Sequence, residues 1–348
     1  MRYAKNDMHT LTLKKGKLEV FGSLLKMNDQ IDIFNIKEQE LGNSSNYDAI
    51  GDLTGYSLGI RYGLTDQIML SYTRTHQKIE YSSDSIFNNR DNIYLRYNFI
   101  QNPYAFFNSG ISLDVGFERN KLDDFYITNI DTINSLISKL LPNENAEIRY
   151  SDGVTAFENE PGPKEEGYYV YFNNSASKLS SEPYVVLKNT KDESFFFRFL
   201  TGYYTSYSLF DFYAGLKKTK IKNLVTTTDE IKKLALDNGY DLEKKLDRYE
   251  DMFFLGFSYS LSHKKFIYEF NYEYEKFFRD EEINYIDYNH IVNASISYAV
   301  TNNLLINIGA KLMYRQLNGQ IPYLYNKYTQ TSYDHKYGYA TFGFQYLF

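Results

Sequence analysis

Hydrophobic and polar residues alternate along most of this chain, and the C-terminal end shows the pattern most clearly. From residue 338 onward the even positions are small, then aromatic, and end in Phe344, Tyr346 and Phe348, whereas the intervening positions are mostly small or polar. Successive side chains of a β-strand point to opposite faces, so this alternation separates two environments. The pattern predicts a strand with one apolar and one polar face.

The same alternation recurs roughly a dozen times between residues 17 and 348. Phe195, Phe197 and Phe199, for example, flank the polar side chain of Arg198. The sequence therefore predicts an all-β chain with twelve strands. Their expected ranges are 17–27, 55–63, 67–80, 90–100, 106–119, 193–205, 208–221, 251–262, 264–279, 286–299, 303–316 and 336–348. Two further segments, 167–176 and 182–190, either raise the number to fourteen or form a hairpin within a loop.

The two faces of the predicted strands differ in a way that favours a membrane protein. The apolar faces carry aromatic residues chiefly near strand ends, and the polar faces carry both charges and glycines. A barrel in lipid has an apolar exterior with aromatic girdles and a polar lumen, and closure leaves no unpaired strand edge. We therefore expect a transmembrane antiparallel up-and-down β-barrel.

The connections between predicted strands alternate between short and long. The short ones cover 63–66, 101–103, 205–207, 262–264 and 300–303, and the long ones cover about 28–54, 81–89, 120–192, 222–250, 280–287 and 317–335. Short periplasmic turns and long extracellular loops are typical of outer-membrane barrels. On this interpretation residues 1–16 form a periplasmic N-terminal segment, and 17–348 form a single barrel.

These features resemble those of Gram-negative outer-membrane β-barrel proteins, and the likeness is to porin-like barrels as a class. Phe348, with Tyr346 and Phe344 on the same face, resembles the C-terminal signal that the barrel-assembly machinery recognises, and residues 62–66 resemble a common hairpin turn. The resemblance implies a location in the bacterial outer membrane. It also implies outer-membrane lipid, lipopolysaccharide and the assembly machinery as partners. Because the N-terminus lacks the apolar core of a signal peptide, we expect the numbering to begin after a cleaved leader.

Composition narrows the remaining possibilities. Aromatic residues make up 18% of the 348 residues, with 36 Tyr and 26 Phe, a density that is incompatible with a disordered chain. No apolar run approaches the roughly 18 residues of a transmembrane helix. With no cysteine, disulfide scaffolds, thiol enzymes and cysteine-ligated zinc are excluded. A net charge of −6 gives no basic field for nucleic acid, and no cofactor or metal site is expected.

Two of the long loops are predicted to contain helices. Within 133–141 the apolar residues share one helical face, and a capping box at 227–230 opens a second helix within 227–246. The first helix either folds into the lumen and narrows it or packs on the loop beside it. The loops are acidic and the rest of the chain is basic. The acidic loops either form a mouth that attracts cations or bind lipopolysaccharide phosphates through divalent ions; the other interpretation is that they only keep the surface solvated.

Charged residues on the polar faces are expected to point into the lumen. Their signs mostly alternate from strand to strand, which predicts cross-strand ion pairs. The other interpretation is that some of these residues contact a solute. The predicted pore-lining residues are Arg61, Arg96, Asp114, Glu118, Arg198, Asp211, Lys217, Glu269, Glu273, Lys311 and Arg315.

The sequence gives no support for an enzyme. The five histidines include His76 and His290 on the lipid-facing parity, where outer-membrane phospholipases place catalytic residues, but the His-x-Ser-Asn-Gly arrangement of those enzymes is absent. No omptin-type partner accompanies the acidic pairs at 123–124 and 281–282, and no phosphate-binding glycine loop occurs. We therefore expect no catalytic residues.

Two functions remain open. The first is a passive, porin-like channel that admits small hydrophilic solutes or ions through a polar lumen. The second is a surface binding, adhesion or structural protein, with the barrel as an anchor and loops 28–54, 120–192 and 222–250 as the contact surface. Deleting 120–192 would distinguish them, because a pore would change its conductance whereas an adhesin would lose its partner.

Overall fold

The computed structural model describes residues 9–28, 50–81, 84–101, 108–141, 145–157, 162, 164–172, 175–205, 207–283, 286–327 and 334–348. The chain forms two compact units. The barrel unit contains residues 1–122, 191–221 and 248–348, and the loop unit contains 123–190 and 222–247. The barrel expected over 17–348 is thus accompanied by a second unit, built from the long loops 120–192 and 222–250.

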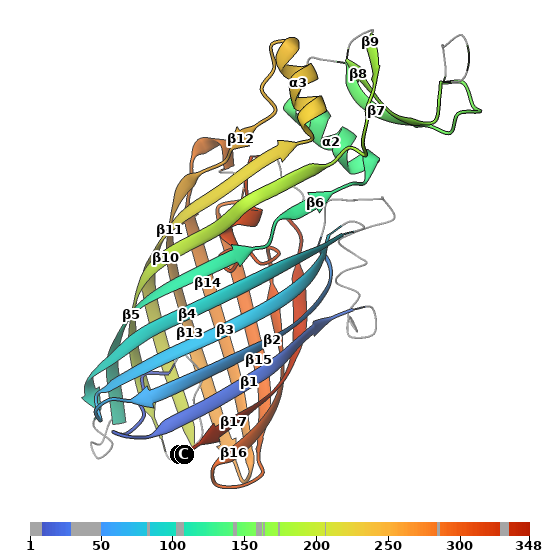
Figure 1. Ribbon diagram of the computed structural model, residues 1–348. Helices are drawn as coiled ribbons and strands as arrows, with labels where there is room; N and C mark the ends of the chain where they lie inside the picture. The colour runs from blue at the N-terminus through green and yellow to red at the C-terminus, as the bar shows by residue number, and fades with distance from the viewer. Residues whose placement is uncertain are drawn as a thin grey trace. The chain divides into compact units, whose positions relative to one another are not determined.

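The barrel unit is a closed ring of twelve antiparallel strands (Figure 1). Closure occurs at β1 (Leu18–Met27), which pairs with β2 (Ile50–Gly63) on one side and with β17 (Tyr337–Leu347) on the other. The ring continues through β3 (Ile68–Tyr81), β4 (Asp84–Gln101), β5 (Asn108–Leu122), β10 (Val185–Tyr204), β11 (Ser208–Thr227), β13 (Arg248–His263), β14 (Phe266–Phe278), β15 (Tyr288–Ala299) and β16 (Leu304–Met313). The predicted fold class and strand number are confirmed.

The burial pattern of the barrel is the reverse of that in a soluble protein. Phe195, Phe197 and Phe199 are 46%, 46% and 48% exposed, whereas Arg198 between them is 7% exposed. Aromatic and aliphatic side chains therefore cover the outer surface and charges lie inside, as a barrel immersed in lipid requires. No helix among the described residues is long and apolar enough to cross a membrane.

Several strands run beyond their predicted ends. The long connection expected over 81–89 is wrong, because β3 ends at Tyr81 and β4 begins at Asp84. The N-terminal extension of β4, residues 84–89, includes the polar residues Asn88 and Asn89, which are in register with β3. A polar strand end of this kind keeps its backbone pairing without showing the apolar alternation used for the prediction.

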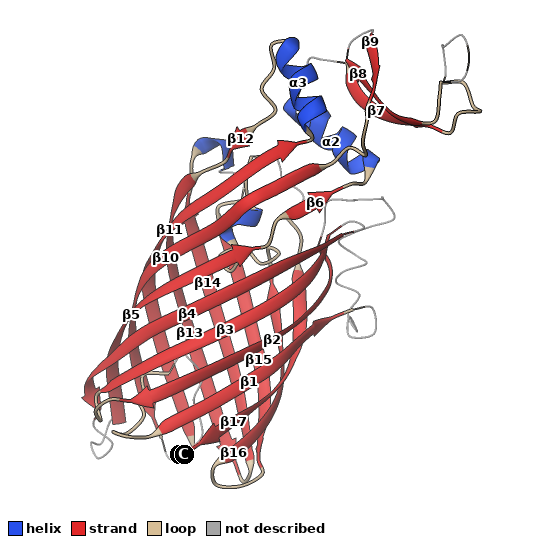
Figure 2. Cartoon of the chain, viewed as in Figure 1, coloured by secondary structure: helices blue, strands red, loops and turns tan. Residues whose placement is uncertain are grey.

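The loop unit contains short strands and two helices (Figure 2). Its elements are β6 (Phe125–Ile127), α2 (Ile130–Leu140), β7 (Ala146–Ser151), β8 (Gly167–Phe172), β9 (Ser175–Lys178), α3 (Asp229–Asp237) and β12 (Lys244–Lys245). Segment 167–176 forms a separate three-stranded sheet with β7, and residues 185–187 of β10 pair with β6. Fourteen barrel strands, the alternative prediction, is therefore wrong.

Helix α2 packs on the strand beside it, as the second of the two interpretations expected. The Asn134 side chain donates to the carbonyl of Ile148 and accepts from its amide, at 2.9 and 2.7 Å. Apolar residues of both helices line one small core, among them Ile133, Ile137 and Ile231. The loop unit thus has a hydrophobic core of its own.

The capping box predicted at 227–230 does not form. Thr228 is the N-cap of α3 but makes no side-chain cap bond. Glu230 instead accepts hydrogen bonds from the amide of Ser180, at 2.9 Å, and from its hydroxyl. The carboxylate therefore joins α3 to the segment after β9.

Candidate functional site

The interior of the barrel unit gathers most of the charged residues singled out from the sequence. Asp114 on β5 lies between Arg96 on β4 and Arg198 on β10, and the three residues are direct partners across the strands. Both guanidiniums bind the same carboxylate, through contacts of 2.7 and 2.8 Å from Arg96 and 2.9 and 2.6 Å from Arg198. The predicted cross-strand ion pairs are confirmed for these residues.

A second ion-paired group lies further along β4 and β5 and includes a residue of β11. Glu118 accepts from Lys217 at 2.8 Å and also pairs with Arg90. Glu118 and Lys217 were expected in the lumen. Arg90 was missed because the strand was predicted to begin at that residue. The extension of β4 to Asp84 brings Arg90 well inside the strand.

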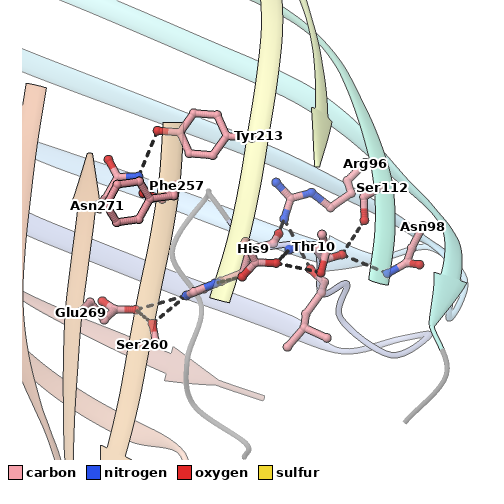
Figure 3. A network of polar contacts seen from close by, with 12 residues as sticks. His9, Thr10, Arg96, Asn98, Ser112, Tyr213, Phe257, Ser260, Glu269 and Asn271 are labelled. Atoms are coloured by element: carbon pink, nitrogen blue, oxygen red, sulfur yellow. Dashed lines mark hydrogen bonds and ion pairs between the residues drawn. The ribbon is translucent and has the colours of Figure 1, made fainter. Parts of the chain in front are cut away.

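Asp211 was expected to continue the first row, but it binds the N-terminal segment instead. Its carboxylate lies 2.6 Å from His9 Nδ1 and accepts from the amide and hydroxyl of Thr10 at 3.1 and 3.0 Å. The other ring nitrogen of His9 is 2.9 Å from Ser260 Oγ and 3.7 Å from Glu269 (Figure 3). His9 therefore lies between two carboxylates inside the barrel.

The surroundings of His9 determine its charge. Burial lowers the pKa of His9, but hydrogen bonds to Asp211 and Glu269, with the charges of both, raise that pKa from 6.5 to about 9. His9 belongs to the N-terminal segment, outside the twelve strands. At neutral pH the imidazole is protonated and balances the carboxylates.

Polar side chains of the barrel wall bind the backbone of the N-terminal segment. The carbonyl of Thr10 accepts from Ser112 Oγ at 2.6 Å and from Asn98 Nδ2 at 2.9 Å, and Arg96 donates to the carbonyl of His9 (Figure 3). Arg96 thus bonds both to Asp114 in the ion-paired row and to the N-terminal segment. These bonds satisfy backbone groups that would otherwise be buried without a partner.

Apolar side chains fix the same segment at the end of the barrel that holds the short turns. Leu13 packs with Met69, Tyr94 and Phe196, and Leu11 packs against a second cluster that includes Tyr204. The segment 1–16, expected in the periplasm, therefore places residues 9–13 inside the barrel. Apolar side chains face the lumen here, where the alternation predicts polar ones. These exceptions are the sequence feature that could have indicated the docking of the N-terminal segment.

The loop after β16 also enters the barrel. Residues 316–326 are buried, including η2 (Pro322–Leu324), and their carbonyls accept from inward-facing side chains of several strands. Lys217 Nζ donates to Gly319 O and Asn120 Nδ2 to Gln320 O, both at 2.9 Å. Residues 317–326 of the predicted loop 317–335 thus constrict the lumen, and residues 328–333 lie outside the described residues.

Two cavities lie in the lumen near these segments. One has a volume of about 380 Å³ and the other about 250 Å³, and both are lined by Arg90, Lys311 and Gln320. Hydroxyl and amide side chains line much of the larger cavity. Six of the predicted pore-lining residues reach one or both cavities: Glu118, Arg198, Lys217, Glu269, Glu273 and Lys311.

Arg61 and Arg315, which were predicted to line the pore, lie apart from the central network. Arg61 pairs with Glu19, its register partner on β1. Arg315 lies beyond the end of β16, pairs with Asp334, and has its guanidinium 4.4 Å from the ring centre of Tyr314. Arg315 is therefore a loop residue, because β16 ends at Met313 instead of reaching the predicted residue 316.

Asp211, His9 and Ser260 lie in the order of a Ser-His-Asp hydrolase site, but a fourth group joins them. Ser260 Oγ donates to Glu269 Oε1 at 3.3 Å, whereas in such a site the serine hydroxyl donates to the histidine. Ser260 is also fully buried, with 0% exposure. Among the described residues, no cluster of histidines and acids has the arrangement of a metal site.

The C-terminal aromatic residues lie on the outer face of the barrel. Phe344, Tyr346 and Phe348 are 41%, 36% and 57% exposed, and the rings of Tyr346 and Phe348 meet edge to face at 4.6 Å. The amide of Phe348 donates to Leu18 O at 2.8 Å, across the closure of the ring. The assembly role of these residues stays a prediction.

Comparison with known proteins gives broad likenesses only. No protein-family model and no curated protein sequence matches the chain. Among solved structures, it is similar to the translocator domain of autotransporter NalP from Neisseria meningitidis, with 9% identity over 96% of this chain and 90% of that chain and a TM-score of 0.46. It is also similar to the NanC porin (8% identity, 94% and 98% covered, TM-score 0.43) and to a TodX monoaromatic hydrocarbon channel mutant (10%, 96% and 90%, 0.42). The predicted resemblance to outer-membrane β-barrel proteins is confirmed by the closed twelve-strand ring itself.

Proposed function

We propose that the protein is a passive outer-membrane channel for small hydrophilic solutes or ions. The observation that carries the proposal is the pair of polar cavities inside the ring, of about 380 and 250 Å³. Eight-stranded barrels are filled by side chains and barrels of 16 to 18 strands hold an open channel, so twelve strands leave a lumen of intermediate width. The N-terminal segment and residues 316–326 narrow that lumen, which favours small solutes.

Lys311 is the charge that we expect to influence ion selectivity most directly. It lines both cavities, and no ion-pair partner is found for it among the described residues, whereas Glu118 and Arg198 are neutralised by close partners. Reversing a lumen charge changes which ions enter. Lys311→Glu should therefore raise the cation-to-anion permeability ratio by roughly threefold.

The measurement is the reversal potential of single channels in a planar bilayer under a salt gradient. Lys218→Glu is the matched control, because Lys218 is an exposed strand residue paired with Asp251. Equal shifts in the two variants would argue against conduction past Lys311. A folded barrel that gives no current at all would contradict the channel itself.

The binding function remains the second candidate because the loop unit is a folded structure. It has its own core, and it exposes large apolar side chains such as Tyr126, Tyr150 and Leu236, which are 46%, 48% and 67% exposed. Exposed aromatic residues are common in protein interfaces. Removal of residues 123–190, the larger part of the loop unit, would abolish binding of a partner and spare conduction if this candidate is correct.

We further propose that the protein resides in the outer membrane and has no enzymatic activity. Outer-membrane lipid and lipopolysaccharide would contact the apolar outer face, and the barrel-assembly machinery would recognise Phe348 during biogenesis. A net charge of −6 argues against nucleic acid as a partner.

Phe348→Ala should lower the yield of membrane-inserted barrel in cells without changing the stability of barrel refolded in detergent. The amount of heat-modifiable protein in outer-membrane fractions measures the first effect. Tyr207→Ala, which removes an exposed aromatic side chain in a short turn, is the control. Equal yields for the two variants would contradict the assembly role.

A further inference from the structure

Docking of the N-terminal segment depends on one histidine between two acidic side chains. His9 Nδ1 is 2.6 Å from Asp211 on β11, and His9 Nε2 is 3.7 Å from Glu269 on β14. Without a proton on His9, two carboxylates would face a neutral ring in a place where the imidazole is 1% exposed. Burial of charge without a counter-charge is strongly unfavourable, so the docked state favours the imidazolium.

The wall is shaped to receive the segment. Gly110 and Gly202 are register partners on β5 and β10, and a Cβ atom at either one would lie within 3.0 Å of Thr10 Oγ1. At Gly202 that atom would also lie 2.0 Å from Asp211 Oδ1. The two glycines therefore leave the space that Thr10 occupies.

The contacts that hold the segment are separate from the backbone pairing that holds the barrel strands together, although Arg96 bonds both to Asp114 and to the segment. Residues 9–13 belong to no strand, and the bonds to Asp211, Ser112 and Asn98 are made by wall side chains. The strand-to-strand ladder would remain complete if the segment left. Release therefore requires no unfolding of the barrel.

We infer that residues 9–13 are a releasable plug at the short-turn end of the lumen, held in place by protonated His9 between Asp211 and Glu269. Any effect of this plug on conduction rests on the proposed channel function. The docking itself does not.

The pH dependence follows from the charge on His9. Its pKa is about 9 when docked, and we take 6.5 for the released segment, so docking is strongest below pH 6.5 and weakens as the pH rises through 9. The full difference corresponds to a change of up to about 300-fold in the docking equilibrium. The charged and titratable groups around His9 are Asp211, Glu269, Tyr204 and the ion pair of Arg96 with Asp114, in which Arg96 also donates to the His9 carbonyl.

Cysteine labelling can measure docking directly because the chain contains no cysteine. Thr12 is buried and Lys15 is exposed, so Thr12→Cys reports release and Lys15→Cys reports an accessible thiol nearby. The ratio of their maleimide labelling rates at each pH removes the titration of the thiol itself. In the refolded barrel the ratio of the Thr12→Cys rate to the Lys15→Cys rate should be at most about one-tenth at pH 6.5, and it should rise at least tenfold by pH 9.5.

His9→Gln in the Thr12→Cys background should give a higher ratio at pH 6.5 and remove the rise with pH. His263→Gln is the matched control, because His263 is exposed in a short turn and its variant should keep the original profile. Gly202→Ala provides a second variant that fills the space beside Thr10, and it should raise the ratio at every pH. Heat-modifiability on a gel establishes that each variant is folded.

A ratio near one at pH 6.5 in the unaltered background would show that the segment is not docked and would overturn the inference. A low ratio that does not change with pH, or that His9→Gln leaves unchanged, would overturn the role of the proton. Single-channel recording of the same proteins separates the two proposals. Labelling that depends on pH without any current contradicts the channel alone, whereas current without pH-dependent labelling contradicts the plug alone.

Discussion

Asp114→Asn should lower the free energy of unfolding of the barrel by about 3–5 kcal/mol, because it removes the charge shared by two buried guanidiniums. Asp114 is 0% exposed, and Arg96 and Arg198 are 1% and 7% exposed. Asparagine keeps the size of the side chain, so the loss measures charge more than packing. Urea unfolding in lipid vesicles followed by far-ultraviolet circular dichroism is suitable, since the chain has no tryptophan.

Asp251→Asn is the control for that experiment. Asp251 is paired with Lys218 at 3.7 Å on an exposed part of the barrel, where ion pairs contribute about 1 kcal/mol or less. The two substitutions are chemically identical. If both variants lost the same free energy of unfolding, water in the lumen would compensate for the lost charge of Asp114. The ion pairs of Asp114 would then not be a main contribution to the stability of the barrel.

Replacing residues 317–326 by a glycine–serine linker of equal length should raise single-channel conductance by roughly threefold or more. These residues are buried within the ring and include Tyr323 and Tyr325, which are 1% and 0% exposed. Tyr323 donates to Asn88 on β4 at 2.9 Å, so the constriction reaches strands opposite its own origin. Its removal should widen the narrowest part of the lumen.

The control replaces the exposed stretch 152–156 of the loop unit by the same kind of linker. Conductance should not change in that variant. Polymer-exclusion measurements with polyethylene glycols of increasing size report the pore diameter independently of ion selectivity. An unchanged exclusion limit after replacement of 317–326 would contradict the assignment of the constriction to this loop.

The fold could be predicted from the sequence because, in each strand of a barrel in lipid, every second side chain faces the lipid and must be apolar. Phe195, Phe197 and Phe199 must face outward together, and Arg198 must then face inward. The same parity placed Asp114 and Arg198 on one face of neighbouring strands, so their pairing followed from charge and register. Both inferences depend on contacts between adjacent strands.

The two segments inside the lumen could not be found by that reasoning. Thr10 contacts Asp211 across 201 residues, and Tyr323 contacts Asn88 across 235 residues, and neither contact is part of the pairing between strands. Periodicity carries no information about such contacts. The apolar residues at inward positions, such as Phe196, were the available clue, but alternation alone treats them as exceptions.

The docking site of the N-terminal segment also constrains the order of folding. His9 and Thr10 contact β4, β5, β11, β13 and β14, and the most distant of these hydrogen-bond contacts in sequence, to Ser260 on β13, spans 251 residues, while Glu269 on β14 lies further still along the chain. Contacts of such long range form only after the intervening chain has been organised, because closing a large loop costs entropy before any contact offsets it. Residues near the start of the chain are therefore among the last to reach their native positions, and their docking reports that most of the ring is already in place.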